Sequence, residues 1–274
     1  MRKEKIRPND FKESERPSTR FKQVFDVLIH RFAELLRLSL LQALFFLPLG
    51  VSIIFFHLLI LNAGSLSDAF TVFLFQSLSF LITIPLHLLG TMGSFYALRR
   101  ILWAEGEYAS STFFVGLKEN WKKALLAGIL PGFASALALM GFYLFFVYLA
   151  DSPVIAGLGI TILGIFWMFG MMLTYHTLAQ LCVYENPLGA MMKNSFLLLL
   201  SRFPINLGVL LLSPGIFLAL CLIVPISAFI AVALMLLFSA FGHLFWMANC
   251  LSGFDKLINK EHFPSFYRKG LRQE

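Results

Sequence analysis

Three of the four histidines in the long apolar runs lie deep enough for their side chains to do chemistry there, whereas His57, nearer the outer end of the first run, is interpreted as interfacial. If those runs cross a membrane, His87, His176 and His243 each lie about 7 to 11 residues from the inner end of a helix, roughly 10–16 Å deep. Thr91 follows His87 by one helical turn, and Gln180 follows His176 in the same way. One interpretation is a polar cluster that binds a metal ion or a polar solute. The other, which we favour, is that each neutral ring is hydrogen-bonded between helices.

Other constellations that carry chemistry are absent from the sequence. No Asp, Glu, Lys or Arg lies deep in an apolar run, which argues against an ion-coupled pump, because such a pump generally needs a carboxylate relay. There are no paired carboxylates, no HExxH motif and no Walker A loop. Cys182, Cys221 and Cys250 lack CxxC spacing and fit buried small hydrophobic residues. We therefore predict no catalytic residue, no cofactor and no metal site, and a protein that is not an enzyme.

The composition indicates the environment of the chain. Of its 274 residues 58% are apolar and 14% are charged, and the mean hydropathy is +0.79. Soluble domains are roughly half apolar and about a quarter charged. The first apolar run starts near Leu38, after a polar segment of mixed charge, so we expect no cleavable signal peptide. The sequence predicts an all-α integral membrane protein and excludes a soluble enzyme.

Six transmembrane helices are predicted from the lengths of the apolar runs. A hydrocarbon core of about 30 Å needs about 20 apolar residues per helix. The 47-residue run Pro204–Cys250 is too long for one span, and proline favours a break near Val224-Pro225. These spans form one membrane domain, 21–250, between a polar segment, 1–20, and a tail, 251–274. The predicted spans are 38–61, 69–98, 124–149, 154–183, 204–224 and 226–250.

The basic residues indicate the orientation of the chain. All 22 Lys and Arg fall on one side of the predicted spans: ten up to Arg37, five in 99–123, Lys193 and Arg202, and five in the tail. The three opposite loops carry only Asp68 and Asp151 as charged residues. Because Lys and Arg are enriched in cytoplasmic loops, both termini are expected in the cytoplasm. The net charge of +7 is therefore a topology signal and does not predict nucleic-acid binding.

Two stretches, 21–37 and 110–124, are predicted to be amphipathic helices on the inner membrane surface. The first is most simply an entry helix that orients the first span, and recognition of anionic lipid head groups by its basic residues is the alternative. In the second, Trp121 lies where an interfacial aromatic anchor is expected.

The two basic loops resemble each other and predict a parallel internal repeat, related by an axis along the membrane normal. In each, an acidic residue precedes a pair of bulky apolar residues, a lysine segment and a Pro-Gly pair. The first copy has Glu105, Phe113–Phe114, Lys118–Trp121 and Pro131-Gly132, and the second has Glu185, Met191–Met192, Lys193–Phe196 and Pro214-Gly215.

The stretch Gly90–Gly128 resembles the central signature of the YesL-like bacterial membrane proteins, a family of unknown function. An arginine, an acidic turn, an aromatic pair and a basic-x-Asn-aromatic-Lys segment match it at Arg99, Glu105, Phe113, Phe114, Lys118, Asn120, Trp121 and Lys122. The Pro-Ala-Thr of the family is replaced by Gly90-Thr91-Met92-Gly93. Family members are often encoded beside carbohydrate ABC-transporter components. The resemblance implies an accessory role in sugar uptake in a bacterial cytoplasmic membrane, and it carries over no catalytic residue.

We therefore expect a non-enzymatic membrane protein that acts as an accessory or regulatory partner of a transport system. The expected contact with ABC-transporter components or anionic lipid head groups is the first basic loop, with Arg99, Arg100, Lys118, Asn120, Trp121, Lys122 and Lys123. The alternative is a small transporter or channel whose path is lined by His87, His176 and His243.

Overall fold

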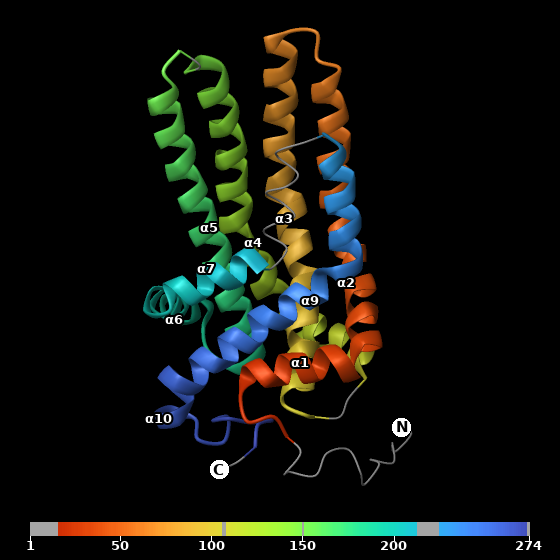
Figure 1. Ribbon diagram of the computed structural model, residues 1–274, viewed down its shortest axis with the longest axis vertical. Helices are drawn as coiled ribbons and strands as arrows, with labels where there is room; N and C mark the ends of the chain where they lie inside the picture. Colours follow the sequence, from red (N-terminus) through yellow and green to blue (C-terminus); the bar gives the residue numbers. More distant parts are fainter. Residues whose placement is uncertain (1–15, 106–107, 150, 213–224, 273–274) are drawn as a thin grey trace.

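The computed structural model describes residues 16–105, 108–149, 151–212 and 225–272, and every regular element in these ranges is helical (Figure 1). Two long hairpins dominate it: α2 (Phe32–Leu61) with α3 (Leu66–Leu102), and α4 (Ala109–Tyr148) with α5 (Pro153–Val183). Ser65 caps α3 by accepting a hydrogen bond from the backbone N–H of Asp68. Pro153 opens α5, where its missing N–H leaves no donor unsatisfied.

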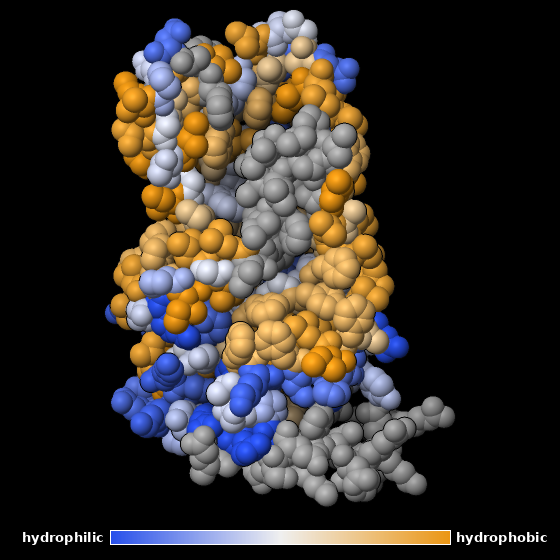
Figure 2. Space-filling view, in the orientation of Figure 1, coloured by the Kyte–Doolittle hydropathy of each residue, from blue (hydrophilic) through white to orange (hydrophobic). Residues whose placement is uncertain are grey.

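Five of the described helices are long and apolar enough to cross a membrane: α2 to α5 and the segment that contains most of α9 (Pro225–Phe254). Large apolar side chains cover their outer surfaces, including Val51, Ile82 and Ile162, each more than half exposed (Figure 2). A surface of this kind is stable in contact with lipid and not with water. The protein is therefore a multi-pass, all-α membrane protein, as the sequence predicts.

The region of the predicted fifth span differs from the expectation. Helices α6 (Leu188–Ser201) and α7 (Phe203–Leu212) meet at Arg202 with a bend of 93°. The described chain therefore has six candidate spans only if this bent pair counts as one. Of the predicted span 204–224, the part 213–224 lies outside the described residues. Helix α9 begins at Pro225, where the proline predicts a break.

The first amphipathic stretch forms two helices and not the single helix expected over 21–37. Helix α1 (Arg20–His30) ends at Arg31, whose φ of −125° and ψ of 27° are not helical, and α2 starts at the next residue. The Arg31 side chain is held by Glu34, with Nη1 and Oε1 3.1 Å apart. Of the residues predicted for the apolar face of this stretch, Val24 is buried, whereas Phe21 is 69% and Phe25 is 46% exposed. Part of the predicted apolar face thus points away from the core.

The second amphipathic stretch, 110–124, is continuous with the third span. Helix α4 has 40 residues and is about 60 Å long, so its first turns extend the span. Glycines let α3 and α4 approach closely along these turns: a Cβ on Gly116 would lie 2.3 Å from Tyr96 Cβ. The second basic loop is different, because its chain bends at Arg202. Since Pro214-Gly215 lies outside the described residues, the parallel repeat stays a prediction.

The packed core lies toward the end of the molecule that carries α1 and the C-terminal segment (Figure 1). Most buried residues of α3 fall in 83–102, and those of α5 in 170–183. Phe95, Phe113 and Trp246 are fully buried there. After α9 the chain forms a π-helical turn, η2 (Asp255–Asn259), a short α10 (Lys260–His262), and a segment that returns to the start of the described chain. There Arg272 N–H donates to the Pro17 carbonyl at 3.1 Å.

Candidate functional site

The first turns of α4 present basic and aromatic side chains together. Lys118 follows Phe114 by four positions, and Trp121 and Lys122 follow Lys118 by three and four, a spacing that places side chains on one side of a helix. All four side chains are exposed. Lys122 Nζ lies 5.4 Å from the centre of the Trp121 ring, within the range of a cation–π contact. We refer to these four residues, with the exposed Lys123, as the α4 basic face. Within the described residues none of its lysines forms an ion pair.

The other residues predicted for this contact surface have different partners. Arg99 and Arg100 lie 3.7 and 3.5 Å from the Glu105 carboxylate, which also contacts Lys269 Nζ at 2.7 Å. Arg99 also donates to the Cys182 carbonyl. These guanidinium groups therefore hold α3 to the loop that follows it, to the end of α5 and to the C-terminal segment. Asn120 is half-buried and donates to the Gly116 carbonyl in its own helix, so it adds little to the exposed surface.

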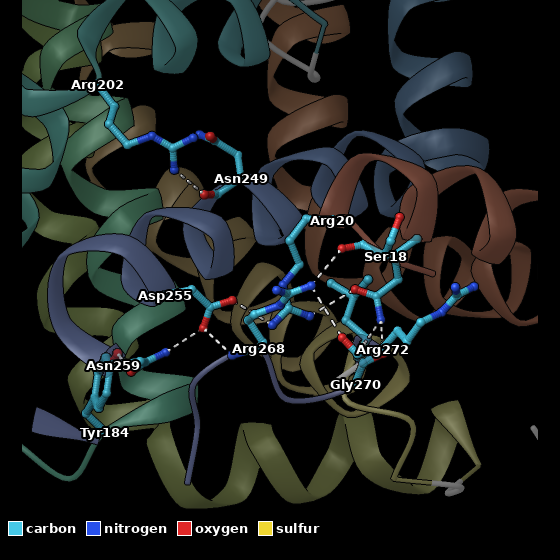
Figure 3. Close-up of polar contacts among 12 residues, drawn as sticks. Ser18, Arg20, Tyr184, Arg202, Asn249, Asp255, Asn259, Arg268, Gly270 and Arg272 are labelled. Carbon is cyan, nitrogen blue, oxygen red and sulfur yellow. Dashed lines mark hydrogen bonds and ion pairs between the residues drawn. The ribbon is translucent and has the colours of Figure 1, made fainter. Parts of the chain in front are cut away.

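A buried ion pair joins the two ends of the described chain (Figure 3). Arg20 Nη2 donates to Asp255 Oδ2 at 2.9 Å, and both side chains are less than 10% exposed. Asp255 Oδ1 accepts from the Asn259 side chain and from the backbone N–H of Arg268. Burial lowers the pKa of Arg20, and the Asp255 carboxylate opposes that effect. The π-helical turn thus directs Asp255 and Asn259 into the protein.

Tyr184 and Gln23 extend this arrangement to α3 and α5. The Tyr184 hydroxyl donates to Asn259 Oδ1 at 2.6 Å, and burial, with the nearby Asp255 carboxylate, raises the pKa of Tyr184. Gln23 Nε2 donates to the carbonyls of Leu102 and Gly270. Gly270 has φ +83°, and a Cβ there would lie 2.1 Å from the Leu102 carbonyl oxygen. We call Arg20, Gln23, Tyr184, Asp255, Asn259, Arg268 and Gly270 the terminal network.

Sequence reasoning missed the terminal network. Arg20 and Asp255 are 235 positions apart, and no pattern along the chain pairs them. Both lie in stretches that look like ordinary polar flanks of the membrane domain. One available signal was Gly270, a glycine in a basic tail, which is typical of a turn with positive φ. The network ties α1, the ends of α3 and α5, and the C-terminal segment together, so we assign it to the architecture.

The three intramembrane histidines are all buried, and each has its own neighbours. His87 packs against Phe46, and His243 against Phe95 and Tyr175. His176 packs against Trp246, with Nδ1 3.3 Å from Cys250 Sγ. Among the described residues no group of three or more His, Cys, Asp or Glu side chains is arranged to hold a metal ion.

The hydrogen bonds of the two polar partners predicted for the histidines go, among the described residues, to groups other than the imidazole rings. Thr91 donates to the backbone carbonyl of His87 at 3.3 Å. Thr91 accepts a hydrogen bond from Gln42 on α2, and Gln180 donates to Ser195 on α6 at 2.6 Å. His87 lines a cavity between the two hairpins, whereas His176 and His243 are not part of its wall. His87 and His243 are nevertheless close enough to interact electrostatically, and Tyr175 packs against both His243 and Trp246, which is the neighbour of His176. A functional cluster of the three histidines stays a prediction.

Comparison of the chain with protein-family models, with curated proteins and with solved structures finds no match in any of the three. The fold and the sites define a multi-pass helical membrane protein with a basic, aromatic surface on the first turns of α4.

Proposed function

We propose that this protein is a non-enzymatic component of a bacterial cytoplasmic membrane that acts by contact, as an accessory or regulatory partner of a carbohydrate transport system. The observation that carries the proposal is the α4 basic face. Exposed lysines beside exposed aromatic rings form a surface that binds an acidic partner, because the rings supply apolar contact area and the lysines supply charge complementarity.

Two further observations support this role. The stretch Gly90–Gly128, which contains the α4 basic face, resembles the YesL-like family, whose members are often encoded beside carbohydrate ABC-transporter components. The census of basic residues favours an inner-membrane location with this surface in the cytoplasm, where the cytoplasmic domains of a transporter are accessible.

The proposal is tested by copurification from native membranes without removal of the lipid. We expect the double variant Lys118→Glu/Lys122→Glu to lose at least about tenfold of its transporter partner, since charge reversal turns an attraction into a repulsion. The matched control is Lys256→Glu/Lys260→Glu, which makes the same charge change at exposed lysines outside the α4 basic face. Arg99 and Arg100 are left intact because they hold Glu105. Equal recovery of partner with both double variants would contradict the proposal.

A transporter or channel role is the second candidate, favoured by the cavity that His87 lines. It predicts solute flux in proteoliposomes that is lost in His87→Ala. Flux that survives this change, or no flux at all, leaves the contact role as the better explanation.

A further inference from the structure

Helix α1 has three sides of different character. One side is a row of apolar side chains at four-residue spacing, which we call the α1 ridge: Phe21, Phe25 and Ile29. About 100° further round the helix is a polar row: Lys22, Asp26 and His30. The third side is buried against the protein: Arg20, Gln23, Val24 and Val27. A helix with one buried, one apolar and one polar side fits a position where protein, lipid and water meet.

The α1 ridge is as exposed as the lipid-facing side chains of the spans. Ile29 is 73% and Phe21 is 69% exposed, compared with 61% for Val51 in α2. The rings of Phe21 and Phe25 touch edge to face, with centroids 5.0 Å apart, so the ridge is one continuous apolar strip. Such a strip is unfavourable in water, and contact with acyl chains removes that cost.

The length of α2 indicates the level of α1 in the bilayer. Helix α2 starts at Phe32, directly after the break that ends α1, and ends at Leu61, 29 positions later and so about 44 Å along the helix. A bilayer with its head groups is about 40–45 Å thick. When Leu61 lies at the outer surface, α1 therefore lies at the level of the inner head groups. Figure 1 shows α1 across the direction of the hairpins, as in a helix that lies in the membrane plane.

The surface beside α1 continues toward the lipid-facing side of the spans. Phe32 is half exposed and contacts Phe241 of α9, with ring centroids 5.3 Å apart. Phe241 in turn contacts Phe238, which is 39% exposed. On the face shown in Figure 2, the hydrophobic surface gives way to a hydrophilic one near the level of α1. This continuity favours lipid over a water-soluble protein as the cover of the α1 ridge.

We infer that α1 is an in-plane anchor whose ridge lies in the inner leaflet, at the boundary between head groups and acyl chains. The polar row then faces the head groups and water. Asp26 Oδ1 lies 3.1 Å from His30 Nδ1 in this row, so apolar contact and not charge holds the anchor, and anionic lipid is not required. None of the residues of the α4 basic face is involved, so this anchor and the proposed contact role stand or fall separately.

The test is spin labelling of the full chain in phosphatidylcholine vesicles, in a background with the native cysteines replaced by alanine. Collision rates are measured with oxygen, which collects among acyl chains, and with a neutral nickel chelate, which stays in water. Ile29→Cys on the ridge is compared with Lys22→Cys on the polar row of the same helix. We expect an oxygen-to-nickel collision ratio at least about fivefold higher at Ile29→Cys, because its label lies among the acyl chains.

Two further positions calibrate the measurement. Val51→Cys in the span of α2 gives the value for lipid, and Lys260→Cys in α10 gives the value for water. Phe21→Cys reads the other end of the ridge, so a folding defect in one ridge variant does not decide the result. Thermal unfolding of each labelled variant checks that it is folded.

Two outcomes would overturn the anchor. Equal, low ratios at Ile29→Cys, Phe21→Cys and Lys22→Cys would place the ridge in water. Low collision rates with both reagents at the two ridge positions, while Val51→Cys stays accessible, would show that a protein or a second copy of the chain covers the ridge.

The independence from lipid charge is tested in vesicles that contain one third phosphatidylglycerol. We expect the collision ratio at Ile29→Cys to stay within about twofold of its value in phosphatidylcholine, because the ridge makes apolar contacts. A high ratio that appears only with phosphatidylglycerol would show that charge recruits α1 to the membrane, and would contradict an anchor held by apolar contact.

Discussion

At the scale of single residues, the Arg20–Asp255 pair is a buried ion pair outside the hydrocarbon region. Both charges are removed from water, so the pair is stable only while each partner compensates the other. Asp255 serves two further donors, from Asn259 and from the backbone of Arg268. A single carboxylate thereby connects α1, the end of α9 and the C-terminal segment.

We predict that Asp255→Asn destabilises the protein strongly, by about 3–5 kcal/mol, because it leaves Arg20 buried without a counter-charge while it keeps an acceptor oxygen. Thermal unfolding in detergent measures the effect. Asp26→Asn, at a partly exposed carboxylate on α1, is the control and should change little. The double variant Arg20→Leu/Asp255→Leu should regain part of the loss. An unfolding midpoint of Asp255→Asn equal to that of Asp26→Asn would contradict this account.

At the scale of elements, glycines determine how closely α3 and α4 pack. The stretch in which they do so begins at the first turns of α4, where Gly116 faces Tyr96 and where Gly93 of α3 faces Phe113. A Cβ on Gly93 would lie 2.8 Å from the Phe113 ring. Close contact of this kind keeps the α4 basic face on a rigid support.

We predict that Gly116→Ala separates α3 from α4 and costs about 1–3 kcal/mol, since the added methyl overlaps Tyr96. Gly208→Ala, in α7, meets no atom within 4 Å and should be neutral or stabilising by up to about 1 kcal/mol, because alanine favours a helix. Thermal unfolding of the two variants side by side distinguishes them. Similar unfolding midpoints would show that the packing is looser than described.

The same scale shows what the sequence can and cannot predict. Uninterrupted apolar length identified α2, α3, α4 and α5, because burying a polar backbone in lipid demands helices of that length. The break at Arg31 and the continuity of α4 could not be predicted from the sequence. The periodicity of apolar residues is the same whether a helix ends, bends or continues. At the candidate site, Lys118, Trp121 and Lys122 are predicted contact residues, and the structure leaves all three side chains exposed, whereas their contact with a partner stays a prediction. The pairing of Arg99 and Arg100 with Glu105 depends on the turn that ends α3, where the Glu105 N–H donates to the Arg100 carbonyl, and periodicity does not encode such a turn.

At the scale of the whole molecule, the described ends of the chain and the α4 basic face belong to a part rich in charge, whereas the opposite turns carry few charged residues (Figure 2). By the positive-inside rule, this asymmetry predicts that the part rich in charge faces the cytoplasm. The orientation in the cell is a prediction from the charges, and cysteine labelling measures it.

We predict that Asn62→Cys and Asp151→Cys react with a membrane-impermeant maleimide on intact cells, and that Lys256→Cys and Lys260→Cys react only after permeabilisation. All four residues are exposed: Asn62 and Asp151 lie in turns, Lys256 in η2 and Lys260 in α10. The background has the three native cysteines replaced by alanine. Labelling of Lys256→Cys on intact cells would reverse the proposed orientation.

The Arg20–Asp255 pair also constrains the order in which the protein is made. Synthesis proceeds from the N-terminus, so the Arg20 side chain is completed long before the partner 235 positions later exists. Until α9 and the residues after it have left the ribosome, this guanidinium has no counter-charge and must remain in water. We therefore expect α1 to pack against η2 and the C-terminal segment as the last step of biogenesis, after the hairpins have entered the membrane.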